Sequence, residues 1–421
     1  MDGPLAGIKV LEFTEVIAAP LAGMLLSDMG ADVTKIEPPW GDPWRSTQPC
    51  SDTESRPFIA YNRGKKDITL DLTTDVARQV LEKLVPTVDV VLVNYRPDVA
   101  ANLGVDYQTL YDLNPMIIYC EVTAFGREGE DADRPGYDLI IQGMSGLMNA
   151  EAKIIDGTPQ HISSTPLIDT TAGFSIAWLV SSALYAREKS GKGQKIETTL
   201  LGTALALMGM RYVQIEELDA ANRMDTLNTL DALRTANVSF RDIRDIYDSE
   251  HPQVPGHIYY RAYTTGNGAI TVGCLSDVLR KKLLDVLNLE DIRFSTDYDP
   301  SSSEAISFGK ELVYRAEQIF LTKSSEEWLE TLGKWGIPAG PVRYVEEVFD
   351  DPQVKSNNLT VDLQHQDLGV VRMVGPLATF SETPMRTLPL AALGQHTDET
   401  LLELGYPQVE IDAWRADGII R

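Results

Sequence analysis

The stretch GIKVLEFTEVIAAPLAGMLLSDMGADVTKIE, residues 7–37, contains two β-prone runs separated by one helical segment. Gly7–Phe13 is rich in Ile, Val and Leu and predicts a strand. Pro20–Met29 places apolar residues at helical spacing, and Gly30 follows in the position of a helix C-cap. Ala31–Glu37 predicts a second strand, which two prolines end. This strand–helix–strand order is typical of a parallel sheet.

The same alternation continues to about residue 125. Three further β-prone runs, at Ile68–Leu72, Asp89–Tyr95 and Met116–Phe125, follow in order, and Thr74–Leu84 is predicted as a helix between the first two. Strands interleaved with helices of ~10 residues predict a parallel sheet covered by helices on both faces. Because these segments lack a Gly-x-Gly-x-x-Gly turn, we expect a Rossmann-like layer but infer no dinucleotide.

The composition changes after the apolar helical run that we predict at Leu200–Leu218. Residues 219–253 are polar and mixed in charge, which is typical of a connector. Residues 258–274 have the pattern of a hairpin around Gly266–Gly268, and a polar break follows at Ser301–Ser303. We predict three parts: residues 1–224 as the N-terminal part of a large α/β domain, residues 225–330 as a small α+β domain, and residues 331–421 as a segment returning to the large domain.

Charge and cysteine content exclude several classes of function. The chain has 37 Lys and Arg against 62 Asp and Glu, a formal net charge of −25. Nucleic acids and anionic membranes require clustered basic residues, so we expect neither as a partner. The three cysteines are widely spaced and odd in number, which argues against a disulfide framework or a metal cluster and favours a reducing, cytoplasmic location.

We also expect no targeting or membrane segment. The first residues lack the basic and apolar regions of a signal peptide. Leu200–Met210 is apolar but has roughly half the ~20 residues that a membrane span needs. Pro166–Ala186 is longer, and Asp169 near its start indicates a buried helix of a globular core.

The residues alone reveal little catalytic chemistry. Five scattered histidines form no His-x-x-x-His pair, and the chain has no Gly-x-Ser-x-Gly elbow and no phosphate-binding P-loop. We therefore expect no metal site and no permanently bound cofactor. The histidines are His161, His251, His257, His365 and His396.

Asp169 is the one candidate nucleophile. It stands just before a long apolar helical run, among small neighbours. One interpretation is a helix N-cap, whose carboxylate accepts from free N–H groups of the first turn. The other is a carboxylate nucleophile held at the positive end of a helix. The residues themselves leave both interpretations open.

Several blocks together carry a resemblance that covers the chain from residue 3 to its final helical segment. They are Gly3–Phe13 with Ala19 and Pro20, Gly30–Pro38 with Gly41–Pro43 and Arg45, Asn62–Lys66 leading into Ile68–Leu72, Asn94–Pro97, Tyr137 and Asp138 with Gln142, Ser145 and Gly146, then Asp169, Gly336–Val342 and Gly394–Glu399. In this order and spacing they resemble the class III CoA-transferase (CaiB/BaiF) family, which includes formyl-CoA and carnitine CoA-transferases.

The resemblance implies an interlocked homodimer in which each subunit has a large α/β domain and a small domain. It also implies that Asp169 attacks an acyl-CoA thioester, giving a mixed anhydride and then an aspartyl-CoA thioester that the acceptor carboxylate opens. CoA and acyl-CoA are then substrates, and the other partner is a small carboxylic acid. Backbone N–H groups would stabilise the oxyanion.

The resemblance also assigns CoA contacts. The thiol end of CoA is expected near the residues after the first strand, for which core packing is the alternative: Val16, Ile17 and Ala18. The adenosine half is expected at two further strand ends: Leu70, Asp71, Leu72 and Thr73, with Asn94, Tyr95 and Arg96. Arg134 either meets a CoA phosphate or is a solvated surface residue. Asp138, beside Tyr137, takes the family's acidic position near the active site.

Two departures narrow the expected substrates. Asn102 stands where many members have a basic residue, so one CoA phosphate contact is expected to be missing. The formyl-CoA transferases have a run of glycines that closes over the intermediate, whereas residues 251–257 read HPQVPGH here, with a single glycine. We therefore do not expect formate and oxalate as substrates.

The alternative function is an isomerase, since α-methylacyl-CoA racemases resemble the same family. They need a His and an Asp on either side of the α-carbon, one to remove a proton and the other to return it. The racemase pattern has His directly before Asp, where this chain has Tyr137. A tyrosine with an ordinary pKa near 10 is a poor base at neutral pH.

Overall fold

The computed structural model describes residues 3–250, 257–294 and 303–421. They form two compact units, Met1–Ala220 with Lys355–Arg421 and Ala221–Val354. The second unit ends at residue 354, beyond the predicted boundary at 330, because β11 (Ala339–Pro341) pairs with the sheet of this unit. The helix α14 (Ser325–Lys334) also crosses the predicted boundary.

The first unit is built on a sheet of six strands in the order β3-β2-β1-β4-β5-β8. All neighbouring strands are parallel, as the strand–helix alternation predicts. The order is that of a Rossmann-like sheet, in which the chain adds strands outward on one side of β1 and then on the other. The strands are β1 (Lys9–Phe13), β2 (Asp32–Glu37), β3 (Lys66–Thr69), β4 (Val90–Val93), β5 (Ile118–Thr123) and β8 (Gln194–Thr199).

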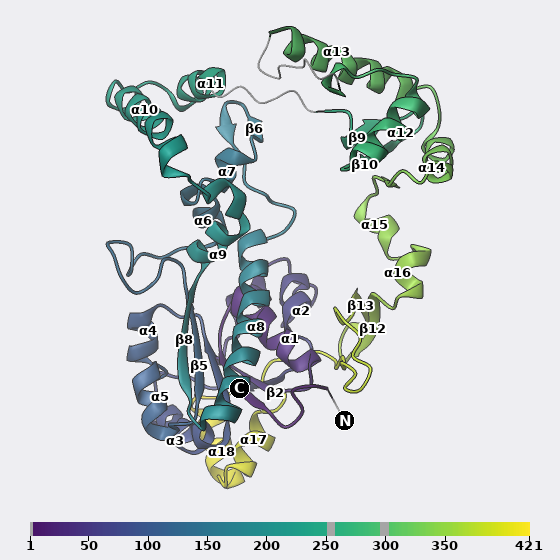
Figure 1. Cartoon of the computed structure of the whole chain (residues 1–421). Coiled ribbons are helices and arrows are strands. Elements are labelled where there is room, and N and C mark those ends of the chain that lie inside the picture. Colours follow the sequence, from purple (N-terminus) through teal and green to yellow (C-terminus); the bar gives the residue numbers. More distant parts are fainter. Residues whose placement is uncertain (1–2, 251–256, 295–302) are drawn as a thin grey trace. The chain divides into compact units, whose positions relative to one another are not determined.

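Helices cover both faces of this sheet (Figure 1). Because side chains alternate along a strand, Val10 packs under one layer of helices and Leu11 under the other. The first layer contains α1 (Ala18–Asp28), α8 (Leu167–Ser190) and α9 (Leu200–Leu207). The second contains α3 (Asp75–Leu84), α4 (Pro97–Asn102), α5 (Tyr107–Leu113), α17 (Thr397–Glu403) and α18 (Gln408–Ala416).

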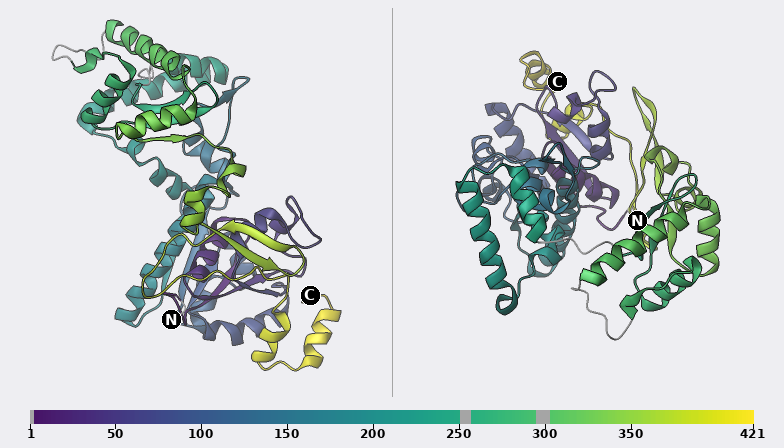
Figure 2. Two further views of the ribbon diagram at one scale, coloured as in Figure 1. Left: turned by 90° about the vertical axis from the view of Figure 1, so that its right-hand side faces the viewer. Right: turned by 90° about the horizontal axis from the view of Figure 1, so that it is seen from above.

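The C-terminal segment returns to the first unit (Figure 2). It is hydrogen-bonded there to the end of β3. The backbone nitrogen of Thr69 donates to the Oγ1 atom of Thr397 at 3.0 Å, and the backbone nitrogen of Arg421 donates to the Oγ1 atom of Thr69 at 2.8 Å. The backbone nitrogen of Asp71 donates to the carbonyl oxygen of Ile419 at 2.8 Å. Residues more than 300 positions apart therefore complete one layer of the fold.

Shorter elements connect this framework. They are a 3₁₀ turn at Pro43–Ser46, α2 (Arg56–Asn62), a 3₁₀ turn at Val85–Thr87, α6 (Asp138–Met144), α7 (Leu147–Ala150), β6 (Ile154–Ile155), β7 (Thr158–Pro159), a 3₁₀ turn at Gly209–Tyr212, α16 (Pro352–Ser356), β12 (Thr360–His365) and β13 (Gly369–Val374).

The second unit is an α+β structure around a three-stranded antiparallel sheet in the order β11-β10-β9. The hairpin of β9 (Tyr260–Thr264) and β10 (Ala269–Gly273) turns at the predicted glycines. Its core includes a ring stack of Tyr263 on Phe320, with centroids 4.0 Å apart. Its helices are α10 (Glu216–Thr235), which begins in the first unit, α11 (Phe240–Glu250), α12 (Asp277–Leu287), a 3₁₀ turn at Ile292–Phe294, α13 (Ser303–Phe320), α14 and α15 (Val345–Val348).

Two predictions about the middle of the chain are wrong. The apolar run at 200–218 is broken after Leu207, and the polar connector at 219–253 contains the helices α10 and α11. α10 has no buried residue, but Met224, Leu227 and Leu230 recur at helical spacing, so the sequence did contain a signal for this helix. Ser301 and Ser302, in the predicted polar break, lie outside the described residues.

One helix, α8, is long and apolar enough to cross a membrane by length and composition. Half of its most apolar window is buried inside the structure, where α8 packs against α1. The prediction of a buried core helix for this segment agrees with that packing.

Candidate active site

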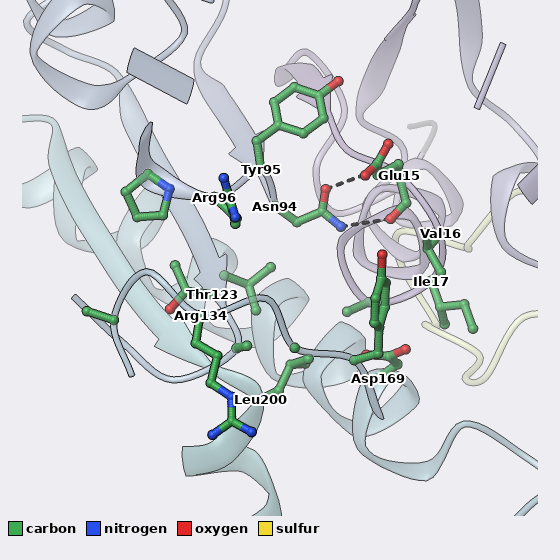
Figure 3. A pocket seen from close by; sticks show the side chains of 17 residues that line it. Glu15, Val16, Ile17, Asn94, Tyr95, Arg96, Thr123, Arg134, Asp169 and Leu200 are labelled. Atoms are coloured by element: carbon green, nitrogen blue, oxygen red, sulfur yellow. Dashed lines mark hydrogen bonds between the residues drawn. The ribbon is translucent and has the colours of Figure 1, made fainter. Parts of the chain in front are cut away.

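A pocket opens at the carboxyl end of the sheet, between the segments that follow β1 and β4 (Figure 3). These two strands are neighbours, yet the chain leaves them toward opposite sides of the sheet. Open parallel sheets bind ligands at such a point, because the two outgoing loops diverge and leave a crevice. The cavity volume is about 110 Å³, below the 300–1,000 Å³ typical of sites that enclose a whole small molecule.

Asp169 lines this pocket from the first turn of α8. It is the third residue of the helix, and the N-cap is Pro166, so the interpretation of Asp169 as an N-cap is wrong. The Asp169 side chain is buried, and among the described residues none donates a hydrogen bond to its carboxylate. A buried carboxylate at the positive end of a helix, with no internal partner, is available to an incoming ligand.

Asp138 performs the capping that Pro166 cannot. Its Oδ2 atom accepts hydrogen bonds from the backbone nitrogens of Ile168 at 2.7 Å and of Asp169 at 3.1 Å. Its Oδ1 atom accepts from Nε2 of Gln142 at 2.5 Å. Asp138 is buried and begins α6, so a carboxylate from one helix stabilises the N-terminus of another.

The surroundings of Asp169 raise its pKa from the ordinary value of 3.8 to about 7. Burial is the larger cause, since it disfavours the charged form, and the negative charge of Asp138 adds to it. Asp169 therefore changes its ionisation near neutral pH, where an ordinary carboxylate is fully charged.

The pocket brings together most of the sequence-predicted site residues. Val16, Ile17 and Ala18 line it after β1, and Asn94, Tyr95 and Arg96 line it after β4. Tyr137 and Arg134 lie at the same pocket. Both arginines are about half exposed and ion-paired with nearby aspartates, Arg96 with Asp98 at 2.8 Å and Arg134 with Asp131 at 3.1 Å.

Leu70, Asp71, Leu72 and Thr73 are not among the residues that line this pocket. They follow β3, which is the outermost strand on its side of the sheet. Leu70 is buried in the core, and Oδ1 of Asp71 accepts from the backbone and the hydroxyl of Thr73. Asp138 stands behind the pocket as a cap and is not among the lining residues either.

Some lining residues were not predicted from the sequence. Thr123 ends β5, the neighbour of β4, and Ala124 follows it, so the parallel strand order is a signal that could have identified them. Glu15 is the second residue after β1 and could have been found in the same way. Leu200 begins α9 directly after β8, the neighbour of β5, so the strand order could have identified it as well.

Comparisons with known proteins agree on one family. A family model described as CoA-transferase family III matches residues 5–397. The chain is 32% identical over 413 residues to succinate–glutarate CoA-transferase from Agrobacterium fabrum, covering 95% of this chain and 96% of that protein. It is 30% identical over 364 residues to acetyl-CoA:oxalate CoA-transferase from Acetobacter aceti, covering 85% and 86%.

A solved structure supports the same conclusion. The crystal structure of a CaiB/BaiF family protein from Brucella suis matches with a TM-score of 0.72 at 28% identity, covering 96% of this chain and 100% of that chain. The family resemblance drawn from the sequence blocks is thereby confirmed. The chain belongs to CoA-transferase family III.

Proposed function

We propose that this protein moves CoA from an acyl-CoA thioester to a carboxylic acid, with Asp169 as the nucleophile. The observation that carries the proposal is the buried carboxylate of Asp169 in the pocket between the segments that follow β1 and β4. This carboxylate accepts no hydrogen bond from the described residues. Known relatives, including CoA-transferases for succinate–glutarate and for acetyl-CoA:oxalate, support transfer chemistry on this fold.

In the first half of the reaction an Asp169 oxygen attacks the thioester carbonyl carbon. The carbon–sulfur bond breaks, CoA leaves as the thiolate, and a mixed anhydride remains on Asp169. The thiolate then attacks the aspartyl carbonyl of the anhydride, which releases the donor acid and leaves an aspartyl-CoA thioester. Each intermediate preserves the activation of the original thioester, so each step exchanges one activated acyl bond for another.

In the second half the acceptor carboxylate attacks the aspartyl-CoA thioester and expels the thiolate again. The thiolate attacks the acceptor carbonyl of the new anhydride, which gives the acceptor-CoA thioester and frees Asp169. The pocket volume suits the reacting acyl end of CoA rather than the whole molecule. The remainder of CoA extends along the carboxyl edge of the sheet, toward Arg96, Arg134 and the Leu70–Thr73 segment.

The proposal includes an interlocked homodimer and a cytoplasmic location. Phe174, Trp178 and Tyr185 share one face of α8 and are exposed in the single chain, so a second subunit would find apolar side chains to cover. The three cysteines are all free, which suits a reducing compartment.

Trapping of the intermediate tests the proposal. The protein is incubated with an acyl-CoA, quenched with hydroxylamine and digested, and the mass of the peptide that contains Asp169 is measured. We expect conversion of Asp169 to the hydroxamate only in the presence of acyl-CoA. An unmodified Asp169 together with catalytic turnover would contradict the role of this residue.

A separate incubation of the protein with acyl-CoA in heavy water decides between transfer and isomerisation. A transferase reacts at the carbonyl carbon, so the α-hydrogen of the acyl group is retained in heavy water without acceptor. A racemase must exchange it. None of the described residues that line the pocket is a histidine, which leaves the two-base mechanism without its usual partner.

A screen of CoA donors against a panel of mono- and dicarboxylates then identifies the donor and acceptor acids.

A further inference from the structure

Val16 has an unusual backbone conformation for its residue type. It lines the pocket, yet its φ is 69°, in the left-handed region. Of the seven described non-glycine residues with positive φ, Val16 alone is β-branched, and β-branched side chains strongly disfavour this region. Such a conformation persists only where the surrounding structure imposes it.

The turn Thr14–Val16 is held by side chains from two other parts of the sheet. Nζ of Lys35, on β2, donates to the carbonyl oxygen of Thr14 at 2.5 Å. Asn94, after β4, makes two hydrogen bonds to the backbone of Glu15. Its Oδ1 accepts from the Glu15 nitrogen at 2.9 Å, and its Nδ2 donates to the Glu15 carbonyl oxygen at 2.7 Å (Figure 3).

Asp42 completes the arrangement. Its Oδ1 accepts from the backbone nitrogens of Trp44 at 2.8 Å and of Val16 at 3.4 Å, the second being a weak hydrogen bond. Its Oδ2 lies 3.1 Å from Nζ of Lys35, and both side chains are 1% exposed. An ion pair this deeply buried fixes its two members in one geometry, so the contacts to Thr14 and Val16 are fixed as well.

We propose that Lys35, Asp42 and Asn94 are positioning residues that impose the left-handed conformation on Val16 and thereby fix the start of α1 opposite Asp169. The inference rests on the proposed function for its catalytic consequence. Lys35 and Asp42 do not line the pocket, so they act through the turn.

The geometry explains why the position of the turn matters. α1 begins at Ala18, two residues after Val16, and Ala18 lines the pocket with Asp169. Gly173, one helical turn after Asp169, packs so closely on α1 that a Cβ there would lie 2.8 Å from the carbonyl oxygen of Ala18. The two helix starts are thus held side by side, and a shift of the order of 1 Å between reacting groups costs about a hundredfold in rate.

The test compares Val16→Gly with Val16→Ala. Both substitutions shorten the pocket side chain, but only glycine adopts positive φ without strain. The pair is made in the wild-type background, in Asp42→Ala, and in Asp42→Asn, which keeps an oxygen for the Val16 and Trp44 nitrogens. Two quantities are measured in each: the unfolding midpoint, and the single-turnover rate of CoA release from acyl-CoA.

In the wild-type background we expect the glycine variant to be the more stable one, because the intact contacts force alanine into a strained conformation, while the two release rates stay within about twofold. In Asp42→Ala the alanine variant relaxes. The difference in unfolding midpoint between the glycine and alanine variants then shrinks. The glycine variant should release CoA at least about tenfold faster than the alanine variant in this background. Asp42→Asn keeps the oxygen for the two backbone nitrogens but loses the charge that is paired with Lys35, so its stability difference should lie between those of the wild-type and Asp42→Ala backgrounds.

Equal stability of the two variants in the wild-type background, or a stability difference that Asp42→Ala leaves unchanged, would overturn the inference whatever the activity. If the variants show the expected stability differences but the wild-type protein releases no CoA from acyl-CoA, the proposed function is refuted instead. If Asp42→Ala does not fold, Val16→Gly and Val16→Ala are compared in the Asn94→Ser background instead. Asn94→Ser removes any contact of Asn94 with the substrate from both variants equally, so the ratio of their release rates is unaffected by that loss.

Discussion

The Oδ2 atom of Asp138 lies 3.1 Å from the backbone nitrogen of Asp169. One carboxylate therefore caps the helix that carries the other, and its negative charge contributes to the raised pKa of Asp169. The arrangement combines a structural role with an electrostatic one. The two roles are separable, because an amide can cap a helix without carrying a charge.

Asp138→Asn should lower the pKa of Asp169 and leave the fold intact. The new side chain keeps an oxygen for the backbone nitrogens but loses the charge that disfavours ionised Asp169 and the hydrogen bond from Nε2 of Gln142. The acid limb of the pH profile for CoA release should move to lower pH but stay above that of an ordinary carboxylate, because burial, the larger cause, remains. The comparison variant is Asp138→Ala, which also removes the cap and should cost about 1 kcal/mol of stability. An acid limb that stays in place in Asp138→Asn would contradict the coupling.

Asp169→Asn should abolish transfer and stabilise the protein at alkaline pH. Loss of the nucleophile should reduce turnover by on the order of a thousandfold or more. Because the folded state raises the pKa of Asp169 from 3.8 to about 7, folding opposes its ionisation, and the stability of the wild type falls as pH rises between these values. Removing the charge should raise the free energy of unfolding by at most about 4 kcal/mol at pH 8 and by little at pH 4.

Urea unfolding of Asp169→Asn and wild type at both pH values measures this difference. Mass spectrometry must first exclude deamidation of the new asparagine, since that reaction regenerates the wild type. A variant that gains the same stability at pH 4 and pH 8 would show that the raised pKa is not the cause.

Gly173→Ala should separate α1 from α8. The added methyl group would lie 2.8 Å from the carbonyl oxygen of Ala18, and backbone cannot give way as a flexible side chain can. We expect a loss of about 1–3 kcal/mol in stability and a lower rate of CoA release. Gly333→Ala is the matched control, because nothing lies within 4 Å of its new Cβ and helical alanine is favoured over glycine. Equal effects of the two substitutions would rule out the close approach.

The proposed interlocked dimer should resist dilution. Separation of threaded subunits requires partial unfolding, so analytical ultracentrifugation at nanomolar concentration should still detect a dimer. Trp178 is 68% exposed in the single chain, and its fluorescence reports whether the α8 face becomes covered. A folded monomer that forms reversibly on dilution would disprove interlocking.

The sheet could be predicted from sequence because its strands are locally distinct. Val90–Val93 is entirely apolar and buried on both faces, which is the pattern of a central parallel strand. The prediction of a connector at α10 was wrong because its many polar residues obscured the helical spacing of Met224, Leu227 and Leu230, none of which is buried.

The site was predictable only in part. Asp169 and the residues after β1 and β4 were found through matching motifs and strand ends. The cap from Asp138 and the conformation of Val16 were not predicted. Both depend on hydrogen bonds between residues 26 to 79 positions apart in the sequence. No local pattern records which distant side chain will satisfy a backbone nitrogen.

The return of the C-terminal segment to β3 has a consequence for the order in which the chain folds during synthesis. The first 220 residues leave the ribosome with one side of the sheet lacking α17, α18 and the hydrogen bond from Arg421 to Thr69. At 5–20 residues per second, residues 221–421 take about 10–40 s to follow. During that interval the apolar layer that α17 and α18 later cover stays exposed on the nascent sheet.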